Sequence, residues 1–238
     1  MKHSISALIF TLGLSSASAW ADDLDQIPFL TQDQFRDVSE DLGAALSYKP
    51  LGPAEPLGLT GFDIGLEVTA TQLKNQDSWD AASSGDAPDT LFVPKLHITK
   101  GLPFNIDVGA MYSAVPDSNI SLLGAELRYA ILPGGTASPA LAIRGTYTKL
   151  SGVDQLDLDT KGVELSISKG FAMITPYAGI GRIWVDSQPD TITLSDESFQ
   201  QNKVYVGANF NLAVINIGAE YDRTDGINSY GLKVGLRF

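Results

Sequence analysis

The clearest pattern in this sequence is the alternation at its carboxyl end. From Tyr230 to Phe238, apolar side chains occupy every second position, and glycine, lysine and arginine occupy the positions between them. A strict period of two places successive side chains on opposite faces of a β-strand. The pattern therefore predicts a strand with one apolar face and one polar face. Its apolar positions are Tyr230, Leu232, Val234, Leu236 and Phe238.

The same alternation recurs nine times between residues 62 and 222 and predicts nine earlier strands, which makes ten in all. At about 9–13 residues each, they have the length of tilted membrane strands. Residues 74–89 and 186–200 are predicted to be long loops, and the other connections are short. The strand around Tyr177 is the least regular, and its phase is assigned with Arg182 on the polar face. Pro94 predicts a bulge, because proline cannot donate to a strand ladder.

Residues 32–46 follow a helical period instead. Thr31 and Gln34 have the spacing of a capping box, and the prolines after the helix keep residues 49–58 extended. One interpretation is a helix packed on the periplasmic mouth of a barrel, or a frayed leader. The other is a plug or lid within the barrel. The apolar positions of this plug helix are Phe35, Val38 and Leu42.

The amino terminus has the features of a secretory signal peptide. A basic start is followed by a short apolar run and by small residues before Asp22. We expect residues 1–21 to be removed. Residues 22–58 then form a periplasmic or lumenal segment, and residues 59–238 form the barrel.

Composition excludes several classes of protein. The 238-residue chain has a formal net charge of −12 and contains no cysteine. The acidic balance argues against nucleic acid as a partner, because such binding depends on clustered lysine and arginine. Without cysteine the chain has neither disulfides nor thiol chemistry.

The closing strand, with Phe238 as its last residue, resembles the final strand of Gram-negative outer-membrane β-barrels. The resemblance implies an antiparallel up-and-down transmembrane barrel. Together with the strands and the helix predicted above, this gives an all-β, ten-stranded barrel with a short N-terminal helix. The resemblance also implies a cell outer-membrane location, contact with outer-membrane lipid and lipopolysaccharide, and recognition of the strand from Tyr230 to Phe238 by the barrel-assembly machinery. A soluble, lipocalin-like barrel is the competing fold, because it alternates in the same way with the apolar face inward.

If the apolar faces contact lipid, the polar faces line the lumen. Acidic and basic residues are nearly balanced there, which fits either a salt-bridged core that fills the barrel or a narrow charged channel. Glycines on the same faces leave room for a small lumen or for the helix. The predicted lumen-lining residues are Asp63, Glu67, Lys95, His97, Asp107, Glu126, Arg128, Arg144, Glu164, Arg182, Lys203, Glu220, Lys233 and Arg237.

The sequence offers little catalytic chemistry. His97 is the one histidine after the signal peptide, and we interpret it as a lumenal histidine paired with a carboxylate rather than as a catalyst. Acidic residues of the outer loops, such as Asp154, Asp157 and Asp190, fit no calcium-loop spacing, so we predict no metal and no cofactor.

The sequence therefore predicts a non-enzymatic outer-membrane barrel, narrow or plugged by the helix, that passes small solutes. The alternative is a structural or adhesive barrel with a filled polar core, which acts through its outer loops. A lipid-modifying enzyme is the third hypothesis.

Overall fold

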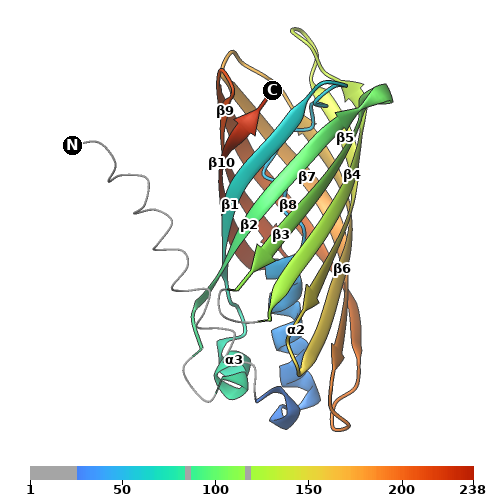
Figure 1. The fold of residues 1–238 in the computed structure, drawn as a ribbon. Helices are drawn as coiled ribbons and strands as arrows, with labels where there is room; N and C mark the ends of the chain where they lie inside the picture. The colour runs from blue at the N-terminus through green and yellow to red at the C-terminus, as the bar shows by residue number, and fades with distance from the viewer. Residues whose placement is uncertain (1–25, 84–86, 116–118) are drawn as a thin grey trace, which may run out of the picture.

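The computed structural model describes residues 26–83, 87–115 and 119–238. The predicted signal peptide, residues 1–21, lies outside these residues. The described part of the chain contains ten strands joined in sequence order into one closed antiparallel barrel (Figure 1). The strands are β1 (Phe62–Gln72), β2 (Thr90–Leu102), β3 (Ile106–Ala114), β4 (Ser121–Pro133), β5 (Ala140–Ser151), β6 (Leu156–Ser168), β7 (Ile174–Pro189), β8 (Glu197–Leu212), β9 (Ile215–Thr224) and β10 (Ile227–Arg237).

The barrel closes where the first strand meets the last. β1 and β10 pair antiparallel, from Asp63 opposite Arg237 to Thr71 opposite Ser229. Just beyond the ladder, Phe62 and Phe238 exchange main-chain hydrogen bonds of 2.7 and 3.0 Å. The terminal aromatic residue predicted to end the closing strand is therefore part of the seam.

The outer surface of the barrel is apolar. The alternate positions that face outward on β10, from Tyr230 to Leu236, are each about half exposed, and equivalent positions of the other strands continue the same surface. The charged position between them on β10, Lys233, faces the interior and is buried, as are most charged positions of the other strands. This arrangement is the reverse of a soluble carrier barrel, which buries its apolar face, so it favours the membrane-spanning fold.

The two ends of the barrel differ. One end, which we call the short-turn end, carries the carboxyl terminus and turns such as 213–214 and Pro103–Asn105 (the 3₁₀ helix η2). The other, the loop end, carries the connection between β1 and β2. That connection was predicted to be a loop, but it contains helix α3 (Gln76–Ala82), whose Trp79 is fully buried. The predicted loop at 186–200 is also shorter, because β7 continues to Pro189 and β8 begins at Glu197.

The bulge predicted at Pro94 is wrong. Pro94 lies opposite Val68 in an unbroken β1–β2 ladder, and β2 has a β3 partner only from Leu96 onward. The missing N–H of Pro94 therefore costs no ladder bond on the β3 side. The register shift occurs instead between β4 and β5, at Ala130 and Leu132.

The chain before β1 runs through the barrel. A 3₁₀ turn, η1 (Ile27–Phe29), precedes helix α2 (Gln32–Leu46), which lies inside the loop end beside α3 (Figure 1). Residues 47–58, which we call the strap, continue to the short-turn end, where β1 begins. We refer to residues 27–58 together as the N-terminal segment. No helix among the described residues is long and apolar enough to cross a membrane.

Candidate functional site

The candidate site is the lumen together with the N-terminal segment that occupies it. Helix α2 has the predicted bounds and the predicted capping box. Gln34 N donates to Thr31 Oγ1 at 3.3 Å, and Thr31 N donates to Gln34 Oε1 at 3.0 Å. Because the cap satisfies N–H groups that a helix end otherwise leaves free, the helix can begin at the barrel mouth.

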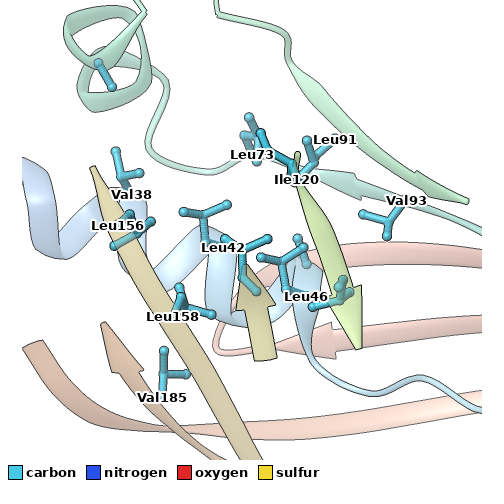
Figure 2. Close-up of a cluster of buried hydrophobic side chains, with 14 of the residues drawn as sticks. Val38, Leu42, Leu46, Leu73, Leu91, Val93, Ile120, Leu156, Leu158 and Val185 are labelled. Atoms are coloured by element: carbon cyan, nitrogen blue, oxygen red, sulfur yellow. The ribbon is translucent and has the colours of Figure 1, made fainter. Parts of the chain in front are cut away.

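An apolar stripe on α2 seals the loop end of the lumen. Phe35, Val38 and Leu42 are fully buried. Leu46 continues the stripe beyond Val38 and Leu42 (Figure 2). Burial of each such side chain contributes roughly 1.5–3 kcal/mol. The stripe packs against apolar side chains that point inward from the strands, namely Leu91, Val93, Leu122, Leu150, Leu156, Leu158, Ile183 and Val185.

Asp41 holds α2 to the connection between β1 and β2. Its carboxylate accepts hydrogen bonds from Lys74 N, from Asn75 N at 3.0 Å and from Trp79 Nε1 at 2.9 Å. Burial raises the pKa of the Asp41 carboxyl, although the three N–H donors oppose that shift. Nearby, Ser78 Oγ donates to the Asp37 carboxylate at 2.8 Å. These contacts fold α3 onto α2 at the loop end.

A second attachment joins the first turn of α2 to β8. Arg36 Nη1 pairs with Glu197 Oε2 at 2.9 Å, and the Arg36 guanidinium lies 4.2 Å from the centre of the Phe199 ring. Gln32 donates to Glu197 and to the carbonyl of Ser195, and it accepts from Ser195 N at 2.9 Å. The helix is therefore held at the mouth from two sides.

The strap is held by wall side chains that bind its main chain. Lys203 Nζ donates to Tyr48 O at 3.3 Å, and Asn209 Nδ2 donates to Leu51 O at 3.5 Å. Further along, Arg128 Nη1 donates to Pro53 O at 2.6 Å. On the acceptor side, Ser168 Oγ accepts from Ala54 N at 3.1 Å, and Asp107 Oδ1 accepts from Leu57 N at 3.1 Å.

Glycines on the wall make room for the strap. A Cβ added at Gly231 would lie 2.7 Å from Leu51 Cδ2, and one at Gly218 would lie 3.1 Å from Leu51 O. At Gly124, an added Cβ would lie 2.9 Å from the Tyr48 ring. These three inward glycines thus form part of the surface on which the strap lies.

A chain of buried ion pairs links inward side chains of β8, β6, β5 and β4. Lys203 contacts Glu164 at 2.8 Å, Glu164 contacts Arg144 at 2.9 Å, and Arg144 contacts Glu126 at 2.9 Å. All four side chains are at most 3% exposed. Because each charge has an opposite neighbour, the polar core is paired rather than left as isolated buried charges.

Other predicted lumen residues form separate pairs nearer the short-turn end. Arg128 contacts Asp107 at 2.6 Å, and Lys233 contacts Asp63 at 2.7 Å. Arg237 lies 3.7 Å from Asp63 at the mouth. Glu220 accepts a hydrogen bond from Tyr177 at 2.9 Å.

His97 lies inside this network. Its Nδ1 is 3.1 Å from Glu67 Oε1, and Lys95 lies 3.9 Å from the same carboxylate. Its Nε2 is 2.9 Å from the hydroxyl of Tyr48 in the strap. The histidine is 2% exposed, so it contacts the strap and a carboxylate rather than solvent.

The prediction that Arg182 faces the lumen is wrong. β7 has the opposite phase, with Ile183 and Val185 inward and Arg182 exposed on the outer surface. There its guanidinium donates to Asn202 Oδ1 at 3.1 and 3.2 Å. The reason is the helix: at the loop end the lumen is apolar, so the rule that polar residues face inward fails.

Sequence reasoning missed both the apolar lining of the loop end and the contacts of the strap. The signal for the lining was the helical stripe itself, since an apolar stripe inside a barrel needs apolar partners on the wall. The strap contacts involve main-chain groups, which leave no trace in a hydrophobic pattern.

The lumen holds little free space around the N-terminal segment. One cavity, bounded by Pro50, Leu57 and His97 among others, has a volume of about 10 Å³. A second, between Leu46 and the ends of β3 and β4, is of the same size. Each is close to the size of one water molecule. Among the described residues, the lumen is filled rather than open.

Several acidic residues of the loop end that the structure describes are bonded to neighbouring side chains. Asp186 accepts hydrogen bonds from Lys161 at 3.0 Å and from Ser198 at 2.7 Å, and Glu197 is bonded to α2. The described residues contain no group of three or more histidine, cysteine or acidic side chains arranged to hold a metal ion.

Comparisons with known proteins assign the chain to no family. No family model matches the sequence, and no curated protein matches it. Among solved structures, a loop-deletion mutant of OmpT, an outer membrane protein of Vibrio cholerae, is 14% identical with a TM-score of 0.33. That match covers 62% of this chain and 54% of OmpT, so the chain spans about half the length of that protein.

The matches to two other barrels cover almost the whole of those chains. The KdgM porin is 9% identical with a TM-score of 0.39, over 74% of this chain and 99% of the porin. Ail, the attachment invasion locus protein of Yersinia pestis, is 12% identical with a TM-score of 0.33, over 77% of this chain and 99% of Ail. These values are too low to transfer a function. The closed strand order and the apolar outer surface show on their own that the chain has the architecture of an outer-membrane β-barrel.

Proposed function

We propose that this protein is a non-enzymatic outer-membrane channel for small solutes and that its own N-terminal segment closes the lumen. One observation carries the proposal: residues 27–58 occupy the lumen from mouth to mouth, yet the strand ladder closes without them. Among the described residues, the hydrogen bonds that this segment makes from main chain to main chain join it to itself and to residues 26 and 61 directly beside it, and none joins it to a barrel strand. Movement of the segment would therefore break no hydrogen bond of the strand ladder.

The charged wall supports passage of polar solutes. With the segment withdrawn, paired residues such as Lys203, Glu164 and Asp107 would line an aqueous path, because their side chains already point inward. The small cross-section of a ten-stranded barrel restricts such a path to small or extended molecules.

In this proposal the protein lies in the outer membrane, in contact with lipid and lipopolysaccharide. The loop end faces outward and the short-turn end faces the periplasm, which is the usual asymmetry of such barrels. The barrel-assembly machinery recognises the closing strand from Tyr230 to Phe238.

Single-channel recording of the refolded protein in planar bilayers tests the proposal. A variant that lacks residues 27–58 is expected to conduct continuously, while the full chain stays closed with rare openings.

A disulfide tether provides a second test, because the chain has no cysteine of its own. Ser39 of α2 and Ser187 of β7 have hydroxyl oxygens 2.8 Å apart, so the S39C/S187C protein should form a disulfide and lose the rare openings until it is reduced.

The matched control is a wall-to-wall disulfide. Thr148 and Thr160 are paired across β5 and β6, with hydroxyl oxygens 2.7 Å apart. The T148C/T160C protein should open as often as the unmodified chain in both redox states. If this control loses its openings too, the tethered helix is not the gate.

A filled structural barrel is the second candidate. The dense ion pairs and the cavities of about 10 Å³ favour it, because both belong to a packed interior. If a correctly folded variant without residues 27–58 passes no current, that result would support the filled barrel and refute the channel.

A further inference from the structure

Side chains of the wall bind the strap through its main chain. Donors on the wall meet the carbonyls of Tyr48, Leu51 and Pro53, and acceptors meet the N–H groups of Ala54 and Leu57. Every peptide carries these groups, whatever its sequence. A wall that binds them recognises an extended polypeptide as such, as in other sites that bind peptide main chain.

Two side-chain contacts add selectivity. Lys49 is 1% exposed, and its Nζ lies 3.4 Å from Asp222 Oδ2 on β9. Ala54 is fully buried and packs with Ala130, Ala140 and Ala142, so the wall at that level admits only a small side chain. The surface therefore fits an extended peptide that carries a cationic residue before a small one.

We infer that the open lumen binds and passes extended, lysine-containing peptides, and that the strap occupies this site as an internal substitute for them. The inference rests on the proposed channel function and names its class of solute. A neutral oligosaccharide fits the wall less well, because it offers no cation to Asp222 and no row of amide N–H groups to Asp107 and Ser168.

The experiment uses a full-length protein whose gate is weakened away from the strap. The Asp41→Ala variant loses the attachment of α2 to the β1–β2 connection but keeps every wall residue that contacts the strap. Single-channel current through this variant is recorded while a capped synthetic peptide with the sequence of residues 48–57 is added. Two probes serve as comparisons: the same peptide with Lys49→Gln, and a neutral oligosaccharide of similar length.

We expect the native-sequence peptide to interrupt the current at the lowest concentration. The Lys49→Gln peptide should need roughly tenfold more, because a desolvated charge pair is lost. Introducing Asp222→Asn into the Asp41→Ala protein should bring the two peptides to the same blocking concentration, which a merely structural role of Asp222 would not do.

The outcomes separate the two proposals. Current that the peptides interrupt no better than the oligosaccharide does would overturn the peptide inference and leave the channel intact. Equal block by both peptides without Asp222→Asn would overturn the cation site. No current from a correctly folded Asp41→Ala protein, nor from the variant without residues 27–58, would overturn the channel, and the peptide inference with it.

Discussion

Asp41 is a buried carboxylate that lies among N–H donors at the loop end of the barrel. Replacement by alanine would leave the indole N–H of Trp79 and two main-chain N–H groups without their acceptor. We expect Asp41→Ala to lower the free energy of unfolding by about 2–3 kcal/mol and to raise the opening frequency. Asp33→Asn, on an exposed position of the same helix, is the control and should change either quantity little.

The Asp41→Asn variant tests how the opening frequency depends on pH. Because burial raises the pKa of Asp41, the neutral form suits the docked helix better than the charged form. The stability that this group contributes is complete below the ordinary aspartate pKa of about 3.9 and is lost as pH rises through the raised value. Acidification from neutral pH through that window should therefore reduce openings of the unmodified protein. Asp41→Asn should remove this component of the pH dependence, and an unchanged profile would contradict the assignment.

Arg182 and Lys203 test the phase of β7, because they lie on neighbouring strands and face opposite sides of the barrel. Lys203 is buried against Glu164, whereas Arg182 is exposed and bonded to Asn202. Lys203→Met should lower the free energy of unfolding, measured in urea, by about 3–5 kcal/mol, because it leaves a buried carboxylate with one partner fewer. Arg182→Met should cost less than about 1 kcal/mol. Equal losses of unfolding free energy in the two variants would mean that Arg182 faces inward.

At the scale of elements, the glycines under the strap separate the barrel wall from the segment. Gly231→Val would place a side chain against Leu51, while the wall strand itself can accommodate valine. We expect more frequent openings with an intact barrel, measured by single-channel recording and far-ultraviolet circular dichroism. In the variant without residues 27–58 the same substitution should have no further effect. Gly145→Val, on the outer face of β5 where an added Cβ meets nothing, is the control.

Most elements could be predicted from the sequence because their side chains alternate or recur at helical spacing. The strand order, the seam and helix α2 with its Thr31 cap follow from those periods. β7 could not be phased, because Ile183 and Val185 pack on a helix far away in the sequence. Helix α3 was missed because it is short and polar apart from buried residues such as Trp79.

The site itself was harder to predict than the fold. Charge and alternation identified most of the inward residues, including Lys203, Glu164 and Asp107, but not what they bind. Arg128 and Asn209 contact carbonyls of the strap, and a carbonyl is present at every residue of any chain. Only the path of residues 47–58 through the lumen, which is a property of the whole molecule, identifies these partners.

At the scale of the whole molecule, the N-terminal segment starts at the opposite end from β1. Residue 27 lies at the loop end, near the β7–β8 connection, where Pro28 O accepts a hydrogen bond from Thr193. If the loop end faces outward, an epitope inserted between residues 26 and 27 should bind antibody on intact cells. The same epitope inserted in the turn at 134–139, at the short-turn end, should bind only after the outer membrane is permeabilised. Labelling of the turn on intact cells would reverse the orientation.

The seam between β1 and β10 also fixes an order of events during biogenesis. Once Phe62 and Phe238 are bonded, the helix could reach the far mouth only by passing a ring of buried charges such as Lys203, Arg144 and Asp63. If the strands gather around a segment already in place, no pair has to break. The segment that closes the lumen would then serve earlier as the template on which the barrel is built, so its loss should slow assembly even where the finished barrel is stable.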